Sequence, residues 1–123
     1  MSREIKFRAW DNEKKFMFNI GKINFERTYV TRKGGYDLIY YFTQLELMQY
    51  TGLKDCKGNE IYEGDIVEER NISDGEHTRR VVFNRGCFWT EGNDGNGNLL
   101  YIPLRIKVIG NIYENKELIK ETK

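Results

Sequence analysis

The sequence has few of the residues from which catalytic and metal sites are usually built. It holds one histidine, His77, and two cysteines, Cys56 and Cys87, which lie far apart and form no C-x-x-C pair. This usage points to neither a disulfide scaffold nor a zinc knuckle, so we expect two reduced thiols. Phosphate-binding loops, dinucleotide fingerprints and H-E-x-x-H motifs are also missing. We therefore predict no metal, no cofactor and no enzymatic activity.

Long hydrophobic runs and an excess of one charge are missing as well. No stretch approaches the roughly 18 apolar residues of a membrane-spanning helix, and the start, MSREIKFRAW, has no apolar signal segment. The net charge is +1; residues 1–48 carry nine Lys/Arg against six Asp/Glu, and residues 49–123 carry eleven against thirteen. A strongly basic nucleic-acid footprint is therefore absent. We expect a soluble cytoplasmic protein with no membrane partner.

Core-forming residues are plentiful. The 123 residues are 39% hydrophobic and include seven Phe, eight Tyr and two Trp. A chain of this length buries roughly two thirds of its unfolded surface, which is enough for one domain. The stretch EIKFRAW alternates in the manner of a half-buried strand and, with the polar turn after it, predicts a hairpin from Glu4 to about Ile20. Its two faces carry Ile5, Phe7 and Ala9 on one side and Lys6, Arg8 and Trp10 on the other.

Glycines and acids punctuate the middle of the chain, in TGLKDCKGNEIYEGDIVEE. Asp55 accepts backbone N–H groups readily and Gly58 tolerates positive φ, so residues 55–58 predict a type I turn closed by a left-handed glycine. Gly64 and Asp65 predict a second turn in the same way. The Gly34-Gly35 pair predicts an earlier turn, and residues 45–51 favour a strand over a short helix.

The second half has the pattern of a β meander. It predicts a polar loop at 71–76, strands at 79–84 and around 88–89, and a hairpin loop at 93–98. Residues 104–113 form the clearest strand, with a bend or bulge at Gly110. Asn115 predicts the N-cap of a short terminal helix.

These segments predict a mainly β protein, all-β or α+β, in one domain spanning 1–123. We expect an N-terminal β-rich lobe at 1–45, a small, strongly bent SH3-like barrel at 46–113 and the terminal helix at 114–123.

Several groups of residues invite a chemical interpretation, and each has a structural alternative that we favour. The acids Asp55, Glu60, Glu63 and Asp65 resemble a paired-carboxylate or cation site, but turn chemistry alone explains the two aspartates. The DGNGN stretch at 94–98 imitates a calcium loop, yet Leu99 and Arg105 stand where that loop needs glycine and its bidentate acid. His77 lies beside Ser73 and Asp74 in a polar stretch, where we expect an exposed loop histidine and no triad.

Lys6, Arg8 and Trp10 are the best candidate surface. On a half-buried strand they would form a row able to stack a nucleobase and hold phosphate. The alternative, which we favour, is that Trp10 packs into the second lobe with the two cations solvated around it. A second basic face is drawn from Arg79, Arg80, Arg85, Arg105 and Lys107.

The stretches IKFRAWD, LMQYTGLKD, NEIYEGDIV and VIGNIYEN together resemble the YopX family of phage and prophage proteins. The resemblance implies a small, mainly β protein made in the cytoplasm of an infected or lysogenic bacterium, and it carries over no catalytic or binding residue. Cys56 and Lys116 depart from the family pattern at a turn and at a helix start.

The absence of a complete catalytic set and the strand pattern favour a phage or prophage accessory protein that binds a host or phage protein. The alternative is nucleic-acid binding through Lys6, Arg8 and Trp10. Because small β structures leave strand edges that can pair, we also expect self-association into a homo-oligomer.

Overall fold

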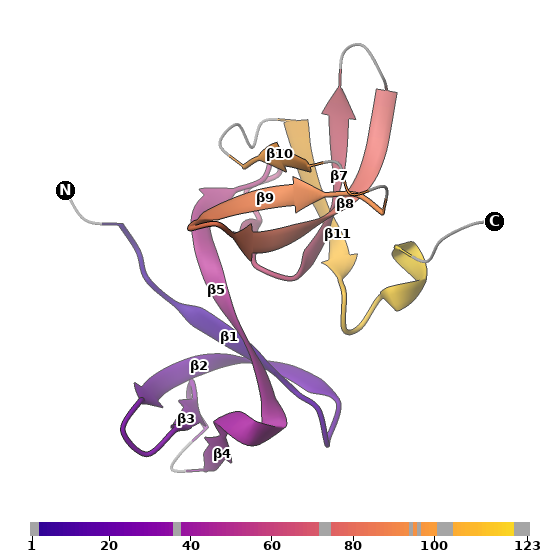
Figure 1. Cartoon of the computed structure of the whole chain (residues 1–123). Coiled ribbons are helices and arrows are strands. Elements are labelled where there is room, and N and C mark those ends of the chain that lie inside the picture. The colour runs from indigo at the N-terminus through magenta and orange to yellow at the C-terminus, as the bar shows by residue number, and fades with distance from the viewer. Residues whose placement is uncertain are drawn as a thin grey trace. The chain divides into compact units, whose positions relative to one another are not determined.

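The regular secondary structure of the chain, represented by a computed structural model, is mainly antiparallel strands (Figure 1). The structure describes residues 3–35, 38–71, 75–93, 95, 97–100 and 105–119. Within these ranges there is no α-helix, and helical residues are confined to short 3-10 turns. None of the described helical segments has the length and apolarity needed to cross a membrane. The predicted mainly β class is confirmed.

The chain divides into two compact units, Met1–Tyr50 and Thr51–Lys123, and the division falls inside strand β5. The strands pair into a six-stranded sheet of order β4-β3-β2-β1-β5-β6 and a five-stranded sheet of order β10-β9-β8-β7-β11. The first unit and the strand that leaves it comprise β1 (Phe7–Asp11), β2 (Phe16–Asn24), β3 (Tyr29–Arg32), β4 (Ile39–Tyr41), the 3-10 turn η1 (Phe42–Gln44) and β5 (Leu45–Lys54).

The first hairpin forms where the sequence predicts it. Strands β1 and β2 pair antiparallel, with Ala9 opposite Phe18. The buried Asp11 closes the turn, because its Oδ1 accepts the N–H groups of Glu13 at 2.9 Å and Lys14 at 3.1 Å. Strand β5 covers the predicted segment 45–51 and pairs with the other edge of β1.

The core of the first unit forms where these strands turn their apolar faces inward. Phe18 and Tyr40 stack with their ring centroids 4.6 Å apart, and each such buried side chain contributes roughly 1.5–3 kcal/mol. The buried members are Ala9, Phe18, Val30, Tyr40 and Leu45. Ile5 was expected on this face but is 63% exposed, because it precedes β1 and has no partner strand to hold it.

The second unit is built mainly from a meander. Its elements are β6 (Glu60–Tyr62), β7 (Asp65–Asn71), β8 (Gly75–Asn84), β9 (Cys87–Glu91), β10 (Gly97–Leu99), β11 (Ile106–Asn111) and the 3-10 turn η3 (Lys116–Leu118). Strands β7 to β10 pair in sequence, and β11 pairs with the free edge of β7. A second core forms in this unit from strands β6, β7, β8 and β11 and from the residue after β10. Its buried members are Ile61, Val67, Val81, Leu100 and Ile106.

The end of β11 confirms one prediction and corrects another. The register against β7 shifts between Val108 and Gly110, which is the expected irregularity at that glycine. A Cβ on Gly110 would lie 2.5 Å from Asn115 Oδ1, so a larger residue would force the Asn115 side chain to shift. The same Oδ1 accepts the Asn111 N–H at 3.1 Å and therefore does not cap a helix. Asn115 leads into a single 3-10 turn, and residues 120–123 lie outside the described ranges.

The small, strongly bent SH3-like barrel expected at 46–113 is not found among the described residues. Strand β5 pairs with β1, so it belongs to the sheet that begins in the first unit. The five-stranded sheet ends at β10 and β11, and the described residues do not pair these two edge strands with each other. Two open sheets result. The sequence pattern marks strands but cannot show which strand each one pairs with.

Asp55 joins the β5–β6 turn to β11. Its Oδ1 accepts the N–H groups of Lys57 at 2.9 Å and Asn59 at 2.8 Å, and Gly58 takes φ +87°, as the predicted turn requires. Its Oδ2 accepts the N–H of Val108 at 2.8 Å, 53 residues away. The predicted local role is confirmed, and the long-range bond is additional.

The second predicted turn has the same chemistry. Gly64 takes φ +90°, and Asp65 Oδ2 accepts the N–H of Tyr62 at 2.7 Å. Gly64 also donates its N–H to Val81 O at 2.8 Å and accepts the Ile112 N–H at 2.9 Å. Both aspartates are therefore buried with backbone partners.

Neutralising Asp55 should destabilise the protein and make its unfolding free energy depend less on pH in the acid range. Burial raises the pKa of the Asp55 carboxyl, but the N–H donors lower it by more, so the pKa lies below its ordinary value of 3.8. The unfolded state therefore takes up the proton first, and stability present above about pH 4 is lost as the pH falls. We expect Asp55→Asn to lower the unfolding free energy at pH 7 by about 3 kcal/mol, since charged hydrogen bonds are replaced by weaker ones.

Urea unfolding of both proteins between pH 2.5 and 7 measures this. The difference in unfolding free energy between wild type and Asp55→Asn should become smaller toward low pH, because the wild-type carboxyl is also protonated there. Glu13→Gln, which removes an exposed carboxylate, is the control. Equal stability of Asp55→Asn and wild type across this range would contradict the role of Asp55.

Candidate functional site

The Lys6–Arg8–Trp10 row begins just before β1 and continues along it, but its members pack against the protein itself. The Lys6 ammonium lies 5.1 Å from the ring centroid of Tyr50 and forms an ion pair with Glu4 at 3.2 Å. The Arg8 Nε–H points to Met48 Sδ at 3.4 Å. Both contacts hold the cations against the same unit of the chain.

Trp10 is buried, with 7% of its surface exposed. Strand β1 lies between β2 and β5, and the cross-strand neighbours of Trp10 are Met17 and Glu46. Side chains of a central strand are shielded from both sides, so the packed alternative describes Trp10 correctly. Its ring offers no open stacking face. Whether the row binds a partner by another route stays a prediction.

The four acids of the central stretch do not form one site. Asp55 and Asp65 are turned toward backbone N–H groups in two different turns, and Glu60 and Glu63 are half-buried. Among the described residues, no group of three or more His, Cys, Asp and Glu side chains is placed to hold a metal ion. The DGNGN stretch, which we expected to form a hairpin loop and no calcium site, includes Asp94 and Asn96, which lie outside the described residues.

His77 is not a loop residue. It lies within β8, half-buried, directly opposite Glu69 on β7. The strand extends further toward its N-terminus than the polar sequence indicated, because pairing with β7 overrides the local preference. Ser73 and Asp74, with which we expected His77 to form no triad, lie outside the described ranges. Cys56 and Cys87 are free and exposed.

The second basic face is split into separate surfaces. Arg79 is largely buried and pairs with Glu69 at 3.4 Å, whereas Arg80, its neighbour along β8, pairs with Glu91 at 3.7 Å. Arg85 lies in the β8–β9 turn. Arg105 and Lys107 line a groove of about 630 Å³ together with Lys57, Arg70, Glu68 and Glu76.

An exposed apolar face on the first unit was not predicted. Tyr29 and Tyr41 lie opposite each other on β3 and β4, with ring centroids 6.4 Å apart. Ile39 follows on the same face because residues two apart on a strand point the same way, and it is 45% exposed. Phe25, in the turn before β3, is 72% exposed. We call Phe25, Tyr29, Ile39 and Tyr41 the β3–β4 face.

Two hollows open on this face. One, of about 490 Å³, is lined by residues including Phe25, Tyr29 and Ile39, and the other, of about 520 Å³, by Tyr29, Ile39 and Tyr41 among others. Clusters of exposed large apolar side chains are uncommon on a monomer and mark interaction sites. The hollows are large enough to seat partner side chains.

The run LIYY carries the only sequence signal for this face. Tyr40 points into the core, while Ile39 and Tyr41 on either side of it point outward. A continuous apolar run normally indicates a strand covered on both faces. The sequence cannot show that one cover is missing, because what lies over β4 depends on the whole sheet.

Comparison with known proteins identifies the family. The profile of the family described as YopX protein matches residues 6–120. The chain belongs to the YopX family. No functionally curated protein matches it.

Two crystal structures share the fold of this YopX-family chain. Protein EF1440 from Enterococcus faecalis is 26% identical, with a TM-score of 0.69, over 97% of this chain and 100% of that one. Protein YopX from Bacillus subtilis is 22% identical, with a TM-score of 0.63, over 96% of this chain and 98% of that one. Both likenesses extend over both units. Their names assign no activity.

The burial of Trp10 can be measured directly. In Trp89→Phe the remaining indole is Trp10, and acrylamide should quench its fluorescence several-fold less in the native protein than after unfolding in urea. Trp10→Phe, which keeps the half-buried Trp89, is the comparison and should quench more readily. Native Trp10 fluorescence that is quenched as strongly as the unfolded protein would contradict the packing described here.

Proposed function

We propose that this YopX-family protein is a non-enzymatic accessory protein of a phage or prophage that binds a protein partner in the bacterial cytoplasm. The partner docks on the β3–β4 face. The single observation that carries the proposal is the exposure of Phe25, Ile39 and Tyr41 side by side with Tyr29 over two hollows.

The chemistry around the β3–β4 face defines the kind of partner. Lys22 and Arg27 line the hollows together with one acid, Glu26, so the rim is net positive. A surface with apolar side chains flanked by carboxylates is complementary to it, and the charges would speed association and fix orientation.

The edge of the sheet supports the same proposal. β4 is the last strand of the six-stranded sheet, and its three residues, Ile39–Tyr41, carry no charge. Uncharged edges accept an added strand, because their outward N–H and C=O groups have no partner in the sheet. A partner strand beside β4 would bring its side chains over Ile39 and Tyr41.

Nucleic-acid binding through Lys6, Arg8 and Trp10 has less support. The buried Trp10 ring cannot stack on a base without rearrangement of β1, and both cations already contact Tyr50 or Met48. Binding that used contacts to the phosphates alone would weaken steeply as the salt concentration rises.

Site-specific photo-crosslinking in host cells tests the proposal. A crosslinking residue in place of Tyr41, which is 53% exposed, should capture one protein reproducibly. The same residue in place of Phe83, which is 51% exposed on the other unit, is the matched control and should not capture it. Ile39→Asp, on the same face, should reduce the Tyr41 adduct at least tenfold by placing a charge in the apolar contact.

Equal capture at both positions, or capture of nucleic acid, would overturn the proposal. A product twice the mass of the chain would show that the face instead joins two copies.

A further inference from the structure

We propose that the outer face of β8, β9 and β10 holds a binding pocket for a guanine base. This site lies within the second unit and is independent of the β3–β4 face. Val82, Trp89 and Leu99 lie in one cross-strand row, and directly opposite residues share a face of the sheet. The adjacent Val81 points into the core, so this row points outward.

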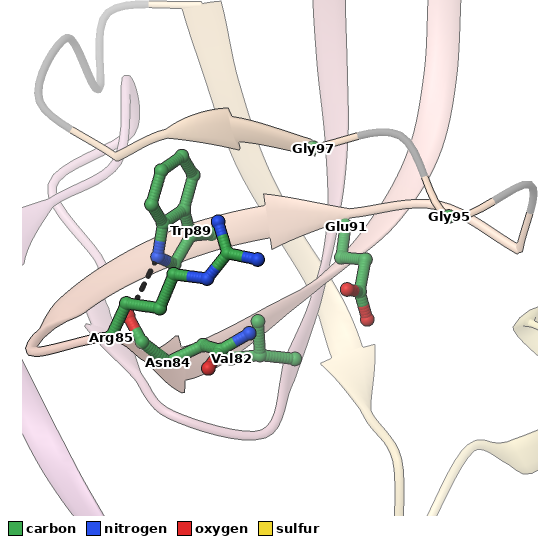
Figure 2. Close-up of a pocket in the computed structure, with 7 residues that line it drawn as sticks. All are labelled: Val82, Asn84, Arg85, Trp89, Glu91, Gly95 and Gly97. Atoms are coloured by element: carbon green, nitrogen blue, oxygen red, sulfur yellow. Dashed lines mark hydrogen bonds between the residues drawn. The ribbon is translucent and has the colours of Figure 1, made fainter.

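The row opens into a pocket of about 190 Å³ (Figure 2). Trp89 and Val82 form its apolar wall, and Asn84, Arg85 and Glu91 supply polar groups. Pockets for drug-sized ligands span about 300–1,000 Å³, so this one is the size for a single ring system.

The pocket is held in shape by its own hairpin. The indole N–H of Trp89 donates to Asn84 O at 2.8 Å, which fixes the ring and leaves its face as the part able to contact a ligand. Gly97 lines the other side, where a Cβ would lie 3.0 Å from Thr90 O. A larger residue at 97 would crowd the β9–β10 pairing beside the pocket.

Arg85 stands in a conformation that costs stability. It takes φ +53° and Gly86 takes φ +77° at the two central positions of the β8–β9 turn. Asn or Gly is preferred at such positions, and an arginine is strained there. Strain of this kind clusters at binding sites, although Lys15 and Thr28 in two other hairpin turns also take positive φ. Here it directs the guanidinium from the turn toward Trp89, as Figure 2 shows.

The charges define the ligand. Among the described residues, no carboxylate lies within salt-bridge distance of Arg85, whereas Glu91 pairs with Arg80 at 3.7 Å and keeps an oxygen for a donor. A guanine base presents acceptors at O6 and N7, which Arg binds in a fork, and donors at N1 and N2, which a carboxylate accepts. Its ring stacks on an indole. Adenine, with no donor at N1, satisfies these groups less fully.

Calorimetric titration with 5′-GMP, 5′-AMP and a single-stranded oligonucleotide containing one guanine among thymines tests the site. We expect 5′-GMP, or the oligonucleotide, to bind at least tenfold more tightly than 5′-AMP or an all-thymine strand. Binding of both shows that the base alone suffices, and binding of the oligonucleotide alone assigns the site to nucleic acid. Trp89→Ala and Glu91→Gln should each weaken binding tenfold or more, since stacking and the donor contact are lost.

Arg85→Gly separates a binding role from a structural one. Glycine suits the positive φ, so this variant should melt no lower than wild type while binding at least tenfold more weakly. Lys14→Ala, an exposed cation of the first unit, is the control and should bind as wild type does. Equal affinity for 5′-GMP and 5′-AMP, absence of binding to every probe, or unchanged binding by Arg85→Gly would overturn the proposal.

Discussion

The fold of the second unit depends on one carboxylate. Asp55 directly follows β5 and accepts N–H groups from its own turn and from Val108 on β11. A local turn and a contact 53 residues away therefore use the two oxygens of one carboxylate. The Cys56 N–H adds a bond to Ile106 O at 3.0 Å beside it. Among the described strands β11 is paired with β7 alone, so these bonds give hydrogen-bond partners to its other edge. Hydrogen bonds to a buried charge are stronger than neutral ones, which suits this position.

The distribution of aromatic residues decides which surfaces remain for function. Trp10 is buried on β1, whereas Tyr41 is exposed on the edge strand β4 and Trp89 is only half-buried on β9. The β3–β4 face is apolar with a positive rim, and the pocket beside Trp89 is small and polar. The two surfaces differ in chemistry, so a partner protein and a small planar ligand would not compete for the same groups.

Local chemistry made the turns and strands predictable. An aspartate beside a glycine of positive φ identifies the turns at 55–58 and 63–65, and alternation identifies β1, β5 and β11. The barrel is not found among the described residues, and the Asn115 cap and the loop position of His77 were wrong, because each depends on which distant strand or backbone group lies opposite. The exposure of Ile39 and Tyr41 in the run LIYY was not predicted, for the same reason. Burial is set by pairing order, which sequence period does not encode.

The native-state hydrogen exchange of the Val108 amide tests the role of Asp55 most directly. If its N–H donates to Asp55, it should exchange as slowly as the amides of the paired core residues Val67 and Val81, since all three would open only when the unit unfolds. Exchange of the Val108 amide at the rate of an unprotected peptide, with Val67 still protected, would show that β11 is not held by Asp55.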